Sequence, residues 1–247
     1  MAAPKYLKKA PIREAILDIR VKLPVNTESV KLLAIQPKIE DRYPNRQVQW
    51  KGQFQIQLDK PDLEAASIAR AVNGYMYRSA DDKQIVQYRL DGFTFNRMQP
   101  YDKWETLRDE GRRLWEFYCE AMSPETTTRV ALRYINFLEL PTPVHEFAEY
   151  LTSPPVVPAN LPQGVSSFLT RIVINEPTQG VAAVITQALE KIIKPDIVPI
   201  ILDIDAIKEG PFGPDSPEIW ETFERLRIFK NQVFFESVTE KALELFQ

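Results

Sequence analysis

The chain carries one short motif twice, once in each half. The stretch Ile219-Trp220-Glu221-Thr222-Phe223 opens the last part of the chain, and Lys103-Trp104-Glu105-Thr106-Leu107 has the same W-E-T core. The two tryptophans are 220 − 104 = 116 positions apart, and a second matched pair, Leu23-Pro24 and Leu140-Pro141, is 140 − 23 = 117 positions apart. Two anchors at nearly equal spacing predict a tandem duplication of one folding unit.

Alternating apolar and polar residues predict strands that follow the same order in both halves. In the first half the pattern predicts strands at 12–23, 48–58, 74–79, 84–90 and 93–97, a short helix after position 26 and a long helix at 102–122. In the second half it predicts strands at 128–140, 168–175, 181–189 and 198–207, a short helix at 144–151 and a long helix that includes Trp220. We therefore expect a β-α-β-β-β(-β)-α unit at 1–123 and again at 124–247, with a Pro-rich connection at 152–164 and both units in one compact, two-lobed body.

The turns between the predicted strands indicate antiparallel sheets. Asp81-Asp82 and Asp91-Gly92 separate neighbouring strands and are typical of hairpin turns. Helices on one side of antiparallel sheets define an α+β architecture. Two such units related by a twofold axis would have the strand order of the saddle in TATA-binding-protein-like folds, although a fold carries no function by itself. Trp104 and Trp220 are expected to anchor one helix each to its own sheet, which leaves the opposite sheet faces as the natural binding surface.

Composition indicates a globular protein of the cytoplasm. The chain has 247 residues, of which 44% are hydrophobic and 26% charged. Its net charge is −3, and the first half is basic whereas the second half is acidic. Its one cysteine, Cys119, allows no internal disulfide and favours a reducing compartment. We expect no membrane span and no signal peptide, because no apolar run is long enough for either. Eight glycines without a phosphate-binding pattern predict no nucleotide cofactor.

Several stretches resemble a known family. They are Leu132-Arg133-Tyr134-Ile135-Asn136, Ile201-Leu202-Asp203-Ile204-Asp205, and the segment from Leu226-Arg227 through Lys230-Asn231 to Phe235-Glu236, with Ala10-Pro11-Ile12 near the start. Over nearly its whole length the chain resembles the sporadically distributed prokaryotic proteins called the TIGR-zero-four-two-five-five family. That family has no established activity, so the resemblance implies no catalytic residue. Its patchy distribution implies an accessory or mobile-element setting, such as defence or toxin–antitoxin cargo.

Two aspartates in these motifs have alternative interpretations. Asp203 and Asp205 are two positions apart on a predicted strand and therefore project from one face. Such a pair can hold Mg²⁺ or Mn²⁺ for phosphoryl chemistry, with Glu236 or Asp18 as a third ligand. We favour a structural network instead, because buried carboxylates need partners and Arg129 and Arg133 share a face of their own strand.

The closing helix is rich in charges that lie among phenylalanines. We predict that at least one of Arg225, Arg227 and Lys230 bridges to Asp203 or Asp205 and ties this helix to its sheet. The residues of this structural or possible site network are Arg133, Asp203, Asp205, Arg227, Lys230, Asn231 and Glu236.

A second candidate surface is a row of long polar side chains on one strand of the first half. Together with two arginines of the following strands, the possible binding face consists of Gln49, Lys51, Gln53, Gln55, Gln57, Arg78 and Arg89. Aromatic residues of the same strands could stack single-stranded bases, although core packing is their usual role. These aromatics are Trp50, Phe54, Tyr75, Tyr77, Tyr88, Phe93 and Phe95.

The interpretation that we favour is a non-enzymatic binding protein with a protein partner. Nucleic-acid binding through the sheet face of the first repeat is the first alternative, and a metal-dependent phosphodiesterase or nuclease that uses Asp203 and Asp205 is the second. His145 is the sole histidine, and no serine or cysteine partner is signalled for it, so we predict no catalytic residue. A homodimer is compatible with this interpretation, and no metal or cofactor is expected.

Overall fold

The computed structural model of the chain describes residues 7–53, 69–214 and 216–247. Within these residues, nine strands form one antiparallel sheet in the order β2-β3-β4-β5-β1-β6-β9-β8-β7. The strands are β1 (Ile12–Lys22), β2 (Asn45–Gln53), β3 (Ala69–Arg78), β4 (Gln84–Arg89), β5 (Gly92–Met98), β6 (Thr126–Pro141), β7 (Leu169–Glu176), β8 (Val181–Leu189) and β9 (Ile197–Phe212). The helices are α1 (Trp104–Met122), α2 (Glu218–Ser237) and α3 (Glu240–Glu244), with the 3₁₀ helices η1 (Ser29–Lys38) and η2 (Phe147–Glu149). The predicted α+β class is confirmed.

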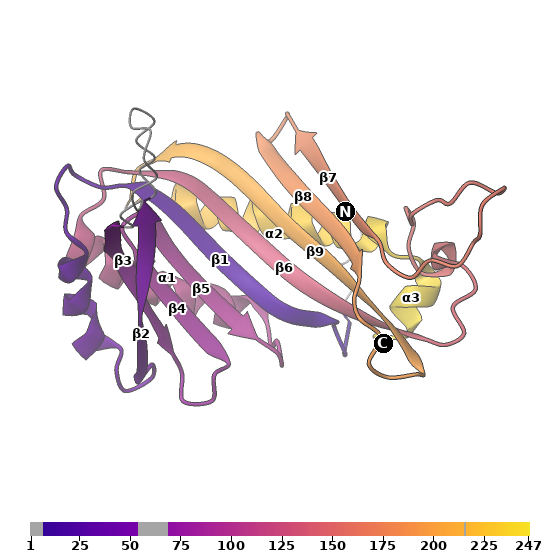
Figure 1. The fold of residues 1–247 in the computed structure, drawn as a ribbon. Helices are drawn as coiled ribbons and strands as arrows, with labels where there is room; N and C mark the ends of the chain where they lie inside the picture. Colours follow the sequence, from indigo (N-terminus) through magenta and orange to yellow (C-terminus); the bar gives the residue numbers. More distant parts are fainter. Residues whose placement is uncertain (1–6, 54–68, 215) are drawn as a thin grey trace, which may run out of the picture.

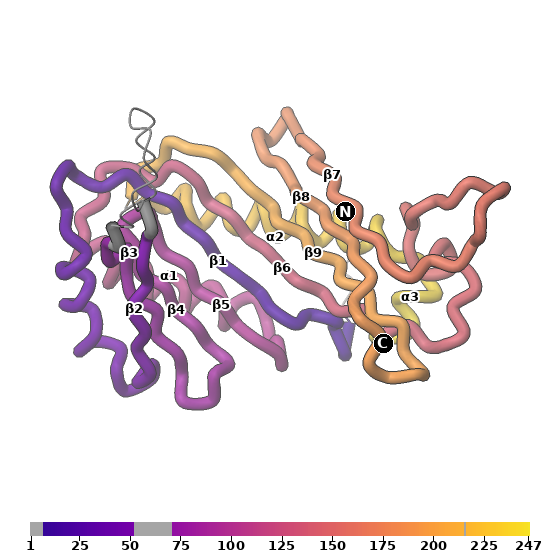
Figure 2. The backbone as a smooth tube through the Cα atoms, in the orientation of Figure 1, coloured from indigo at the N-terminus to yellow at the C-terminus, as the bar shows by residue number. Residues whose placement is uncertain are grey.

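The first strand of each half lies at the centre of the sheet. β1 pairs with β6 over nearly its full length, with Leu17 opposite Leu132, and the tube in Figure 2 shows the two strands side by side. On its other side β1 pairs with β5, and β6 pairs likewise with β9. The sheet is therefore continuous across both halves of the sequence.

One face of the sheet is covered by helices (Figure 1). Helix α1 packs on β5, β1 and η1, and α2 packs on β9 and β6. The alternation of burial follows from this arrangement: Leu17 and Ile19 on β1 are fully buried beneath the helices, whereas Asp18 between them points to the opposite face. We refer to that opposite side as the helix-free face.

The predicted elements differ from the structure mainly in the short helices. The helix expected after position 26 is the 3₁₀ helix η1, which contains Pro37, and the one expected at 144–151 is a three-residue 3₁₀ turn. A proline removes a backbone donor, which disfavours a regular α-helix at η1. The strand expected at 48–58 begins earlier, at Asn45, and Gln55 and Gln57 lie outside the described residues.

The predicted Asp91-Gly92 turn brings β5 close to β1. Gly92 has φ +147°, and a Cβ atom at this position would lie 2.1 Å from the carbonyl oxygen of Ile19. Glycine therefore permits the tight approach of the two strands, which sets Thr94 of β5 opposite Asp18 of β1.

Candidate functional site: the helix-free face of the sheet

Asp18 is the centre of a polar network on the helix-free face. Its carboxylate accepts hydrogen bonds from Thr94 Oγ1 at 2.7 Å, Arg129 Nη1 at 2.9 Å, Arg20 Nε at 3.0 Å and Arg89 Nη2 at 3.2 Å. The side chain of Asp18 is only 14% exposed. Both of its oxygens are thus satisfied by donors from β1, β4, β5 and β6, which makes the desolvation of this carboxylate tolerable.

Arg129 extends the network to β9. One of its terminal nitrogens contacts Asp18, and the other donates to Asp205 Oδ2 at 3.1 Å. Arg133, four residues along β6 and on the same face, donates to both oxygens of Asp203, at 2.8 and 2.5 Å. This bidentate hydrogen bond raises the pKa of Arg133. Burial raises the pKa of the Asp205 carboxyl, which outweighs the opposing effect of Arg129.

These contacts confirm the ion pairs that the shared strand faces predicted, and they leave the metal interpretation without support. A guanidinium group lies between Asp18 and Asp205, where a cation would have to bind. In the described part of the chain there is no group of three or more His, Cys, Asp or Glu residues that could hold a metal ion. Glu236 is exposed near the end of α2, and its carbonyl accepts a hydrogen bond from Thr152 Oγ1 at 2.6 Å.

The predicted bridge from the closing helix to the aspartates is wrong. Arg227 forms an ion pair with Glu224 at 3.5 Å, Arg225 donates to Thr222 at 3.1 Å, and Lys230 lies over the Tyr134 ring. Asp203 and Asp205 flank Ile204 on β9, and Ile204 is the residue that points toward the helices. Because neighbouring strand residues point to opposite faces, α2 and the two aspartates are separated by the sheet itself.

Lys230 is instead a buried cation within the helix-covered core. Its side-chain nitrogen lies 3.6 Å from the centre of the Tyr134 ring, and the residue is 7% exposed. Burial, with a smaller contribution from Arg227, lowers the pKa of Lys230 to about 7. The hydroxyl of Tyr134 shares a 2.7 Å hydrogen bond with that of Tyr101. Asn231, the next motif residue, is half-buried.

Some residues of the possible binding face in the first half bind other side chains of the same sheet. Gln49 donates to Gln87 at 2.7 Å, and Arg89 is 9% exposed because it contacts Asp18 and Asp91. Lys51 is exposed. Arg78 is half-buried, and its guanidinium group lies 4.0 Å from the Met76 sulfur. The side chain of Gln53 lies outside what the structure describes.

Five of the aromatic residues have the core position that is their usual role, and they are not available to stack bases. Tyr75, Tyr77, Tyr88, Phe93 and Phe95 point toward the helices, with exposures between 0% and 8%. The aromatic strand residues therefore belong to the core, as strand aromatics usually do. Two others remain: Trp50 is 59% exposed, and Phe54 lies outside the described residues.

Sequence reasoning missed an apolar part of the helix-free face. In the second half this face carries half-buried or exposed aliphatic and aromatic side chains, namely Ile135, Phe137, Leu169, Val173, Val184 and Ile201. The signal was present, because the strand at 181–189 is apolar at seven of its nine positions and the strand at 169–176 contains the uninterrupted apolar run 172–174. Such strands look buried on both faces, and only the position of the helices shows which apolar residues have no cover.

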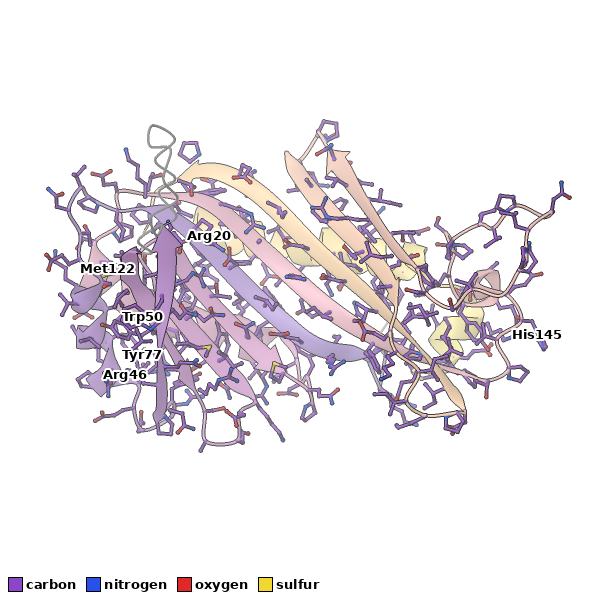
Figure 3. All side chains as sticks on the ribbon, viewed as in Figure 1. Arg20, Arg46, Trp50, Tyr77, Met122 and His145 are labelled. Atoms are coloured by element: carbon purple, nitrogen blue, oxygen red, sulfur yellow. The ribbon has the colours of Figure 1, made fainter. Side chains whose placement is uncertain are left out.

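His145 lies far from this network. It is exposed in the segment between β6 and η2, and Figure 3 shows it near one end of the molecule, away from Arg20. Arg20 belongs to the network around Asp18, so His145 is not part of that network.

Comparisons of the chain with protein-family models, with curated proteins and with solved structures gave no match. No helix in the described residues is both long and apolar enough to cross a membrane.

Proposed function

We propose that the chain is a non-enzymatic binding protein of the cytoplasm whose helix-free sheet face receives a protein partner. The observation that carries the proposal is the pairing of charges on this face. Arg20, Arg89, Arg129 and Arg133 each contact a carboxylate of the same face or of the adjoining Asp91 turn. A face that satisfies its own charges can be covered by a protein at little desolvation cost, because no charge loses its partner.

The apolar side chains beside the network favour the same type of partner. Ile201 lies opposite Phe137 on β6 and opposite Ala188 on β8, so apolar groups adjoin across three strands. Protein interfaces combine an apolar centre with a polar rim. Nucleic-acid binding, the alternative, requires cations that are free to contact phosphates. The four central arginines are already engaged, which makes this alternative the weaker one.

Strand order supports a duplicated architecture, which we also propose. Counted from each edge, the order is β2-β3-β4-β5-β1 and β7-β8-β9-β6, so each half places its first strand at the centre beside the last strand of its meander. Trp104 and Trp220 both lie in the first turn of the helix that closes their half. The same arrangement supports a saddle of the TATA-binding-protein type. The family resemblance, the accessory setting that it implies and the metal-dependent nuclease remain predictions.

A pull-down from the native host, followed by mass spectrometry, tests the function with two matched variants. Ile201→Arg places a charge on the helix-free face, and Ile228→Arg places the same charge on α2, where Ile228 is 68% exposed. We expect Ile201→Arg to lose a protein that the unchanged chain and Ile228→Arg retain. Circular dichroism confirms that both variants are folded. Retention by Ile201→Arg, or salt-sensitive capture of nucleic acid, would overturn the proposal.

A further inference from the structure

Strand β7 is an edge of the sheet with unusual apolar exposure. It pairs with β8 on one side and ends the strand order on the other (Figure 1). Leu169 is 71% exposed, and Ile172 and Val173 are each 50% exposed. Because Ile172 and Val173 are neighbours on a strand, they lie on opposite faces, so β7 exposes apolar side chains on both sides of the sheet.

The β7 edge carries Arg171 and Glu176 but has few of the other features that normally prevent strands from pairing with other chains. Its sequence, Leu-Thr-Arg-Ile-Val-Ile-Asn-Glu, contains no proline, glycine or lysine, and its register with β8 is continuous. Such an edge is a template for a further strand. The opposite edge, β2, differs: it carries Arg46, Gln47 and Lys51, and its register with β3 shifts between Gln49 and Trp50. A charged, bulged edge disfavours pairing.

The sequence of β7 is complementary to itself in one antiparallel register. When a twofold axis passes beside Val173, that residue faces its own copy and Ile172 faces Ile174 of the second copy. In the same register Arg171 faces Asn175, and Thr170 faces Glu176. Apolar residues then face apolar ones and polar residues face polar ones at each step, as cross-strand pairs prefer.

Neighbouring registers lose this match. Only shifts of two residues keep the same side chains on each face of the sheet. A shift in one direction places Arg171 opposite Val173, and a shift in the other places Ile172 opposite Glu176. Centring on Val173 also places no two like charges opposite each other, because Arg171 faces Asn175 and Glu176 faces Thr170.

We propose that two copies of this chain join through β7 in this register and form one continuous antiparallel sheet. The twofold axis is perpendicular to the sheet, so the helices of both copies lie on one side and the two helix-free faces adjoin on the other. This assembly uses the edge of the sheet and goes beyond the partner binding proposed for its face, so either proposal can fail while the other stands.

Cysteine trapping tests the register directly. In a Cys119→Ala background, Val173→Cys places two thiols at the axis, where facing Cα atoms of antiparallel strands are about 4.5–5.5 Å apart, within the range of a disulfide. Leu169→Cys is the matched control, because Leu169 is more exposed and lies on the same face of the same strand. Its two copies would be about 27 Å apart, since eight positions at about 3.4 Å separate them.

We expect mild oxidation to give at least about tenfold more covalent dimer for Val173→Cys than for Leu169→Cys. Sedimentation equilibrium of the unchanged chain should give twice the mass of 28.5 kDa, Val173→Lys should give the single mass, and Ile228→Lys should remain dimeric. Equal trapping of both cysteines, a monomeric unchanged chain or a dimer that survives Val173→Lys would overturn the proposal.

Discussion

The two halves of the sheet are covered in different ways. In the first half η1 packs beside α1 and contacts β3 and β4, so the outer strands are sheltered, and the rings of Tyr88, Phe93, Trp115 and Tyr118 are in contact with one another. In the second half the corresponding short helix, η2, has three residues, and α2 packs on the central strands β9 and β6. The difference teaches that one short helix decides how far the helix-side residues of the outer strands are covered.

The long helices differ at one matched position. Leu114 follows Trp104 by ten residues and is fully buried, whereas Lys230 follows Trp220 by ten residues and is a buried cation. The first half therefore has a purely apolar contact where the second half places a charge on an aromatic ring. Four tests, with six substitutions in all, show how far this contrast determines the stability of each half.

The largest expected effect is that of the two matched tryptophans. Trp104 is 3% exposed and donates to Glu224 of α2 at 2.7 Å, so it joins the two helices, whereas Trp220 is half-buried beside Phe223. Trp104→Ala should cost about 3–5 kcal/mol of unfolding free energy. Trp220→Ala should cost less, which corrects the expectation of equal anchors. Chemical denaturation measures both, and equal costs would contradict this asymmetry.

The next effect concerns the buried cation. Lys230→Met should stabilise the protein by on the order of 1–4 kcal/mol at pH 6, because it removes a charge from the core. The pKa of Lys230 in the folded protein is about 7, below the usual value of 10.5. Below pH 7 Lys230 is therefore charged in both states, and the folded protein bears the full free-energy cost of burying that charge. This cost diminishes as the pH rises toward 10.5, since the unfolded chain then binds more protons than the folded one.

Urea denaturation of both chains between pH 6 and pH 10 measures this effect as a difference. The advantage of Lys230→Met over the unchanged chain should shrink as the pH rises. The Tyr134 ring attracts the ammonium group and should reduce the size of the effect. A difference that stays constant across the range would mean that Lys230 keeps its ordinary pKa.

A smaller effect is expected at the junction of the two halves. Asp18→Asn keeps the shape of the side chain and removes the charge that Arg89 and Arg129 share, so it should cost about 1.5–3 kcal/mol. Asp203→Asn should cost less, because its partner Arg133 is 44% exposed. Thermal unfolding compares the two, and a larger loss for Asp203→Asn would place the main network in the second half.

The smallest effect is expected on the outer surface of α1. Arg112 and Glu116 form an i,i+4 ion pair at 3.6 Å with side chains that are 58% and 65% exposed. Arg112→Ala should change the unfolding free energy by no more than about 0.5 kcal/mol. A change above 1 kcal/mol in chemical denaturation would show that charges on the outside of the first half matter as much as those on the helix-free face.

The sequence predicted the positions of the strands better than it predicted which face of the sheet the helices cover. Strict alternation located β1, and the Asp91-Gly92 turn marked the start of β5, because period and turn chemistry are local properties. The pairing of Arg129 and Arg133 with two aspartates was also predictable, since residues two apart on a strand share a face. It was not predictable that Lys230 lies over Tyr134, because that depends on which face α2 covers.

The central position of β1 has a consequence for the folding of the chain. Leu17 pairs with Phe95 on one side and with Leu132 on the other, which are 95 − 17 = 78 and 132 − 17 = 115 positions further along the chain. During synthesis β1 is therefore made before both of the strands that pair with it, β5 and β6. Loops of these lengths must close before the apolar residues of β1 are covered. Contacts so distant in sequence slow folding. We expect an early interval in which Leu17 and Ile19 are exposed and a chaperone can bind them.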